Sequence, residues 1–165
     1  MLLQKYLIVL AVSHRVQADD PTAPFKTFDD PVYKKIVKGI ISNERIEFVG
    51  EEAGDKTTHA EQITKEVLGP GHYLNVNPSV EDIERLGVAQ PCHGAPLGEP
   101  PVMYWSIEKN ENKENYWVDR IVEANPQKGL LICGCFHAFS VAAKLLKRGF
   151  KVETRTYKPW DKLAE

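Results

Sequence analysis

The feature that most constrains the fold is the stretch 129–153, GLLICGCFHAFSVAAKLLKRGFKVE, whose pattern indicates a strand, a helix and a second strand in succession. Residues 130–135 are almost wholly apolar, which is typical of a strand covered on both faces of a parallel sheet. After His137, apolar residues recur at helical spacing as far as Gly149, a residue that suits the end of a helix. This unit predicts an α/β fold. His137 falls at the carboxyl end of a strand, where open α/β sheets bind ligands.

The rest of the chain continues the same alternation. Strands are predicted at 6–12, 45–50 and 72–76, and helices at 31–42, 58–69, 77–87 and 112–124. Pro31 suits the first turn of a helix, Thr58 and Glu61 have capping-box spacing, and Asn77 with Pro78 marks the start of a third helix. With strands at 130–135 and 150–156, the order predicts a single α/β domain over 1–165. We expect three layers, with a mostly parallel sheet of about five strands and helices on both faces.

Composition argues against several classes of function. The chain has 165 residues and a formal net charge of -2, and its basic residues are scattered among acidic ones, so we expect no nucleic-acid partner. Cys92, Cys133 and Cys135 have neither a disulfide framework nor paired CxxC spacing, which favours a reducing, cytoplasmic compartment. No apolar run approaches the roughly 20 residues that a membrane-spanning helix needs.

The first 20 residues, MLLQKYLIVLAVSHRVQADD, have two interpretations. As a buried strand, residues 6–12 end at Ser13 and His14, which repeats the strand-then-histidine pattern of His137. As a secretory signal peptide, the segment has a lysine, a short apolar centre and a cleavage point near Ala18. The two are exclusive because cleavage removes His14. We favour the strand, and secretion after cleavage near Ala18 remains the alternative.

Ionisable side chains follow three of the predicted strands. His14 follows the first, Glu51 and Glu52 follow the second, and His137 follows the strand at 130–135. Parallel strands bring their carboxyl ends to one edge of the sheet, so we expect these side chains to meet there. Two imidazoles with one or two carboxylates suit a divalent ion such as zinc, manganese, iron or cobalt, or a metal-free acid-base pair. The alternative is structural, in which the histidines only bind loop backbone and the glutamates begin a solvated turn.

The segments LAVSH, VGEE and ICGCFH resemble the superfamily that includes the TraB/PrgY and GumN proteins, Tiki-type metalloproteases and erythromycin esterases. Those families have a GxxH motif after the first strand, an acidic residue after the second, and another GxxH near the end, before a helix and a glycine. Residues 134–137, GCFH, match the second motif fully. The first is AVSH at 11–14, with Ala11 in place of glycine, and the acidic position corresponds to Glu51 or Glu52.

The resemblance implies a compact hydrolase of the esterase or peptidase type that acts on a small molecule or peptide. His14, Glu51 or Glu52, and His137 would then be catalytic or hold the metal. The family's helical arginine corresponds to Lys113, with Arg120 two turns later as a substitute. The residues also place His93 in a proline- and glycine-rich loop, 88–102, so we expect it to contact substrate. The alternative from another class is a non-catalytic module that kept the fold and binds a ligand or partner protein.

Overall fold

The computed structural model describes residues 4–19, 27, 29–86 and 107–158. Within them, five strands form one all-parallel sheet in the order β3-β2-β4-β1-β5. The strands are β1 (Tyr6–Val12), β2 (Phe48–Glu51), β3 (Tyr73–Asn75), β4 (Lys128–Gly134) and β5 (Lys151–Thr156). Tyr6 of β1 is in register with Lys128 on one side and Lys151 on the other. The predicted parallel sheet is therefore confirmed, and β1 lies inside it between the two last strands of the chain.

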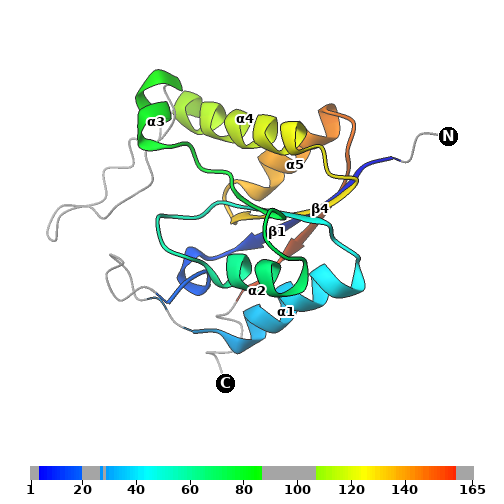
Figure 1. Cartoon of the computed structure of the whole chain (residues 1–165). Coiled ribbons are helices and arrows are strands. Elements are labelled where there is room, and N and C mark those ends of the chain that lie inside the picture. Colours follow the sequence, from blue (N-terminus) through cyan, green and yellow to red (C-terminus); the bar gives the residue numbers. More distant parts are fainter. Residues whose placement is uncertain (1–3, 20–26, 28, 87–106, 159–165) are drawn as a thin grey trace, which may run out of the picture.

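Helices cover both faces of the sheet and complete the three layers (Figure 1). The helices α1 (Pro31–Asn43) and α2 (His59–Val67) pack on one face, and α4 (Ile107–Ala124) and α5 (Ala138–Lys147) pack on the other. Between them in sequence, α3 (Val80–Leu86) contacts α4, where the Tyr116 hydroxyl donates to Asp82. A short 3-10 helix, η1 (His14–Val16), follows β1 directly. None of the described helices is long and apolar enough to cross a membrane.

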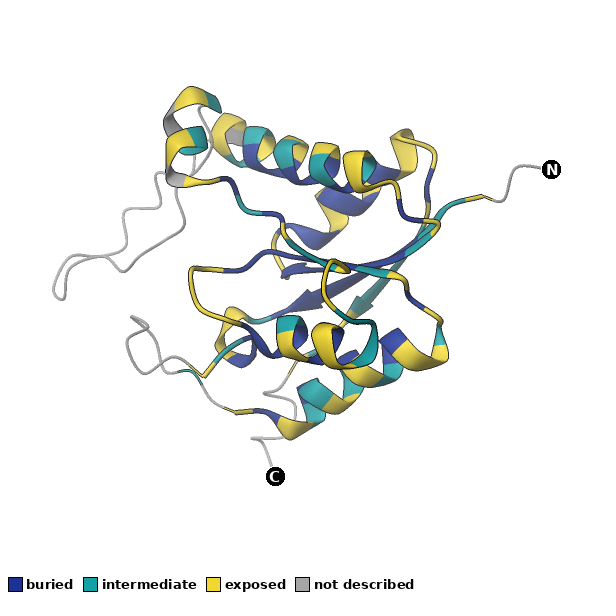
Figure 2. Cartoon of the chain, viewed as in Figure 1, coloured by how far each residue is buried: buried dark blue, intermediate teal, exposed yellow. Residues whose placement is uncertain are grey.

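The core divides along the sheet because alternate side chains of a strand point to opposite faces. In β1, Leu7, Val9 and Ala11 pack with α4 and α5. The intervening Ile8, Leu10 and Val12 pack with α1 and α2. The central strands are buried on both faces, as Figure 2 shows, which explains why they are continuous apolar runs in the sequence. Each fully buried aliphatic side chain contributes about 1.5–3 kcal/mol to this core.

Two helix starts and one helix end are fixed by capping side chains and by a glycine. Asp30 caps α1, whose first residue is Pro31, by accepting from the backbone N–H groups of Val32 and Tyr33. Thr58 caps α2 by accepting from the Glu61 backbone N–H at 3.0 Å. After α5, Gly149 adopts a φ of 88°, a left-handed conformation that glycine reaches without steric cost.

Several predicted bounds are wrong. The second strand begins at Phe48 rather than Arg45, because Arg45 adopts a left-handed φ of 54° in the turn that follows α1. The third helix begins at Val80, where Ser79 accepts from the Asp82 backbone N–H, and Asn77 does not cap it. The helix predicted at 112–124 begins earlier, at Ile107. The predicted loop 88–102, with Cys92 and His93, lies outside the described residues.

Candidate functional site at the carboxyl ends of the strands

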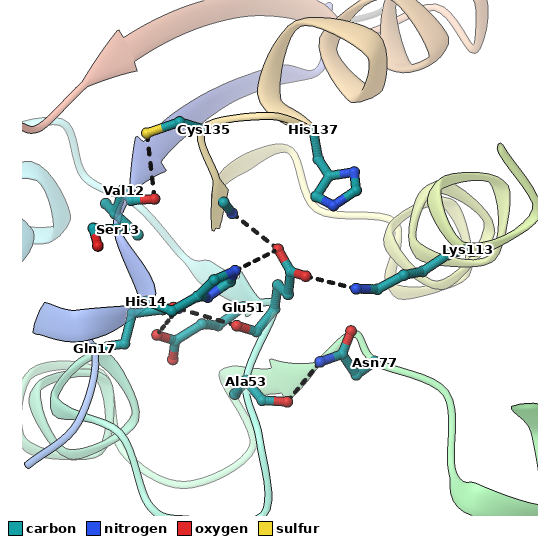
Figure 3. Close-up of polar contacts among 12 residues, drawn as sticks. Val12, Ser13, His14, Gln17, Glu51, Ala53, Asn77, Lys113, Cys135 and His137 are labelled. Atoms are coloured by element: carbon teal, nitrogen blue, oxygen red, sulfur yellow. Dashed lines mark hydrogen bonds and ion pairs between the residues drawn. The ribbon is translucent and has the colours of Figure 1, made fainter. Parts of the chain in front are cut away.

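The carboxyl ends of β1, β2 and β4 are neighbours in the sheet, so the residues that follow these strands lie close together. His14 comes from η1 after β1, Glu52 directly follows β2, and His137 stands at the N-terminus of α5 after β4. Lys113 reaches the same place from α4. Figure 3 shows the labelled His14, Lys113 and His137 pointing into one region from three elements. We call these four residues the strand-end site.

Glu52 is the centre of the strand-end site. Its Oε1 accepts from the Lys113 ammonium at 2.7 Å, and its Oε2 accepts from the Gly134 backbone N–H at 2.9 Å. The His14 Nε2 lies 3.7 Å from the same Oε2. Burial alone raises the pKa of Glu52, but the positive charges of Lys113, His14 and His137 outweigh it and leave the pKa below its usual value. Glu52 is therefore a buried carboxylate that stays ionised at neutral pH.

Lys113 is held in place from two directions. Its side chain is almost completely buried, and its ammonium lies 4.7 Å from the centre of the Trp117 ring as well as against Glu52. The Trp117 indole N–H donates to Asn77, whose amide donates in turn to the Ala53 carbonyl. The cation-π contact and the ion pair both compensate the buried charge. Asn77 therefore holds Trp117 in place beside Lys113, and it does not start a helix.

Glu51 and Glu52 are adjacent in sequence but point to opposite faces of the sheet, as strand geometry requires. Glu51 is fully buried and accepts from Gln17 at 2.8 Å, from Thr58 at 2.5 Å and from Tyr73 at 2.8 Å. None of the cationic side chains in the described residues pairs with it, and burial raises its pKa to about 7, although these three hydrogen bonds act to lower it. Glu51 is therefore separated from the strand-end site, to which Gln17 connects it.

Both histidines are oriented through the same ring nitrogen. The His14 Nδ1 lies 2.5 Å from the Gln17 side-chain oxygen, and the His137 Nδ1 lies 2.9 Å from a Glu114 carboxylate oxygen. Ser140 and Lys144 hold the other oxygen of Glu114. Burial acts to raise the pKa of Glu114, but the hydrogen bond to His137, followed by the contacts with Ser140 and Lys144, outweighs burial and lowers that pKa, so the carboxylate remains ionised. In each histidine Nε2 is the nitrogen left to act on a substrate. A base oriented by a second group is the usual arrangement of catalytic imidazoles.

Gly134, the glycine of the GxxH motif, makes room for this cluster. A Cβ at this position would lie 2.9 Å from the His14 Nε2 and 3.3 Å from a Glu52 carboxylate oxygen, closer than side chains normally approach. The glycine therefore lets an imidazole and a carboxylate meet directly over the end of β4. This gives a physical reason for glycine in the motif that needs no reference to other proteins.

We expect Gly134→Ala to displace the His14 imidazole while the fold persists. The free energy of unfolding should fall by about 1 kcal/mol, the low end of overpacking, because the clash is with the end of a partly exposed side chain. Histidine NMR spectra should show a changed His14 signal and an unchanged His72 signal. Gly54→Ala is the control, since no atom lies within 4 Å of its added Cβ. An unmoved His14 signal would contradict this account of the motif.

The residues predicted from sequence fall into three groups. The structure brings His14, Glu52, Lys113 and His137 together, and places Glu51 behind them. Arg120 lies two turns beyond Lys113 on α4, and its buried Nε has no hydrogen-bond partner among the described residues. His93 lies outside the described residues. Two orienting residues, Gln17 and Glu114, have no motif that reveals them; the only signal for Gln17 is its position three residues after His14.

The donor set does not match a metal centre. Among residues 4–19, 27, 29–86 and 107–158, no group of three His, Cys, Asp or Glu side chains is placed to hold an ion. Both Glu52 oxygens already accept hydrogen bonds, and the Lys113 ammonium supplies the positive charge next to them. Glu51 points to the opposite face. The divalent metal therefore stays a prediction from the sequence.

Comparisons of the chain with protein-family models, with curated proteins and with solved structures give no significant match. The resemblance to the TraB, Tiki and erythromycin esterase superfamily therefore stays a prediction. Function has to be argued from the chemistry of the site. Two oriented imidazoles beside an ionised carboxylate can take up and deliver protons. The described part of the site includes no serine or cysteine hydrogen-bonded to either Nε2.

Proposed function

We propose that the chain is a small hydrolase that uses its two histidines as general base and general acid on water. The observation that carries the proposal is that His14 and His137 point into one region beside Glu52 (Figure 3), with each Nδ1 held by an oxygen acceptor. A structural role needs neither this matched orientation nor two Nε2 atoms that form no hydrogen bond with the described residues. The bond that is cleaved is an ester or an amide, as the resemblance implies.

In this mechanism His14 is the base. Its side chain is 45% exposed, so a water molecule can reach Nε2, and its neutral partner Gln17 does not add charge. The 3.7 Å between Nε2 and Glu52 is longer than a hydrogen bond, so Nε2 is not committed to this carboxylate. His137 is the acid, because the Glu114 carboxylate stabilises the imidazolium that protonates the leaving group. Glu52 stabilises the positive charge that His14 gains on taking the proton from water.

The test is hydrolysis of a panel of esters, peptides and phosphoesters by wild type and by His14→Ala and His137→Ala, with and without a chelator. General acid or base catalysis contributes roughly 10²–10⁴-fold, so each variant should lose at least about 100-fold in kcat/KM while remaining folded. His72→Ala is the matched control, since this histidine is exposed and its imidazole bonds a backbone carbonyl, that of Glu47, away from the strand-end site. A double variant, His14→Ala with His137→Ala, that kept full activity would rule the proposal out.

A non-catalytic binding module is the second candidate, and one observation favours it. Lys113 and Glu52 already satisfy one another in the buried interior, which is typical of a structural ion pair. Ala11 stands where the first motif has glycine, and this departure from the motif also favours a binding module. Saturable binding of a small ligand, with no turnover of any substrate class, would support the module. Turnover that depends on His14 and His137 would count against it.

A further inference from the structure

Gln17 connects the two glutamates to the imidazole of His14. This buried glutamine follows η1, and its backbone carbonyl accepts from the His59 N–H at 2.8 Å, which fixes it to the start of α2. Its side-chain Nε2 donates to Glu51 Oε1 at 2.8 Å and to the Glu52 backbone carbonyl at 3.0 Å. Its Oε1 lies 2.5 Å from the His14 Nδ1. The side-chain amide of Gln17 therefore contacts three groups: the Glu51 carboxylate, the Glu52 backbone carbonyl and the His14 imidazole.

These partners determine which way round the amide must be. The Glu52 backbone carbonyl can only accept, and so can the Glu51 carboxylate once it is ionised, so an NH₂ group has to face them. Reversing the amide would set the Gln17 oxygen against two other oxygens. The Gln17 oxygen must therefore face His14, and because that oxygen can only accept, the His14 Nδ1 must carry a proton. In a neutral ring this leaves Nε2 unprotonated.

Glu51 is itself held so that it can orient Gln17. Thr58, the N-cap of α2, and Tyr73 of β3 both donate to its Oε2, at 2.5 Å and 2.8 Å respectively. Oε1 is left for Gln17, and every recorded partner of this carboxylate is a donor. The hydrogen bonds thus run from a fully buried carboxylate, through one neutral amide, to a half-exposed imidazole at the strand-end site.

We propose that Gln17 is a positioning residue that fixes His14 as its Nδ1–H tautomer, and that Glu51 holds the Gln17 amide in the required orientation. The catalytic meaning of this role rests on the proposed function, in which the Nε2 of His14 is the base. Glu114 orients the His137 imidazole in the same way, but it is negatively charged whereas Gln17 is neutral. The carboxylate stabilises an imidazolium, whereas the amide sets the tautomer without adding charge, so the two histidines are prepared for opposite proton transfers.

The experiment is ¹⁵N NMR of the full chain labelled at histidine, at a pH where the imidazoles are neutral, with His14→Ala to assign the signal. Wild-type His14 should be mainly Nδ1–H. In Gln17→Leu it should shift toward Nε2–H, the form that imidazole prefers in water, while His137 keeps its Nδ1–H form. Gln62→Leu, the same change at an exposed glutamine of α2, should leave both signals unchanged.

A second variant acts through the other end of the chain of hydrogen bonds. Glu51→Gln keeps its oxygen toward Thr58 and Tyr73 and turns its NH₂ toward Gln17. It removes one of the two acceptors that orient the Gln17 amide and leaves the Glu52 carbonyl, so His14 should shift part of the way in the same direction. Wild-type His14 found mainly as Nε2–H would overturn the proposal, whichever variants fold. The readout needs no substrate. The expected tautomer shift, found without hydrolysis of any substrate, would therefore support the role of Gln17 and count against the proposed function alone.

Discussion

Replacing Lys113 by methionine should lower the free energy of unfolding by about 3–5 kcal/mol, the range for a buried ion pair that loses one partner. Methionine keeps the length of the side chain but leaves Glu52 as a buried carboxylate without a cation. Its remaining recorded donor is the Gly134 N–H, and His14 lies beyond hydrogen-bond distance. Chemical denaturation followed by circular dichroism measures the change. The loss is a large part of the roughly 5–15 kcal/mol that stabilises a typical domain.

Two comparisons separate charge burial from packing. Lys65→Met removes an ion pair of nearly the same length, 2.6 Å to Glu61, but on the exposed surface of α2, so it should cost about 0.5 kcal/mol. The double variant Lys113→Met with Glu52→Gln should be more stable than Lys113→Met alone, because no buried charge is left unpaired. If Lys113→Met lay within about 1 kcal/mol of wild type, Glu52 would not be the ionised centre of the site.

Glu51→Gln should stabilise the protein at alkaline pH, although it removes a side chain with three hydrogen bonds. The folded-state pKa of Glu51 is raised from 4.5 to about 7. Between these values the folded chain holds a proton that the unfolded chain has released, so stability falls as pH rises through this window. This pKa shift lowers the free energy of unfolding by about 3 kcal/mol once the pH is above 8. The neutral glutamine has no charge to bury, so the variant avoids this loss above pH 8. Its poorer hydrogen bonds cost about 1 kcal/mol, so at that pH it should be more stable than wild type by about 2 kcal/mol.

The measurement is urea denaturation of wild type and Glu51→Gln from pH 4.5 to pH 8.5. The two free energies should diverge as pH rises. Glu66→Gln, at an exposed carboxyl on the same side of the sheet, should follow the wild-type profile. Parallel profiles for wild type and Glu51→Gln would show that Glu51 has an ordinary pKa in the folded chain. The opposite trend is expected at lower pH from Glu52, whose lowered pKa contributes stability that disappears as pH falls below 4.5.

The sheet could be predicted because its signals are local. Continuous apolar runs identify β1 and β4, and Pro31, Thr58 and Gly149 mark helix ends through side-chain or backbone chemistry that acts within a few residues. Parallel strands then place His14 and His137 at one edge of the sheet. The meeting of distant histidines was therefore a topological prediction, which needed only the correct order and direction of the strands.

The rest of the site depends on contacts between elements, which local patterns do not record. Alternation along β2 requires Glu51 and Glu52 to face opposite ways, but only packing decides that Glu52 faces Lys113. Gln17 and Glu114 were missed because each acts through one side chain across a gap between elements. Asn77 was misassigned for the same reason, since an asparagine before proline suits a helix cap as well as the brace for Trp117 that it forms.

The position of β1 inside the sheet has a consequence for how the chain folds. Its two partners, β4 and β5, begin at Lys128 and Lys151, so β1 forms no strand pairing with the nearer strands β2 and β3. Pairings between residues so far apart in sequence close large loops and form slowly. During synthesis, the first strand emerges long before either partner exists. His14 can therefore join the strand-end site only after β4 has been made, and the site is completed at a late stage of folding.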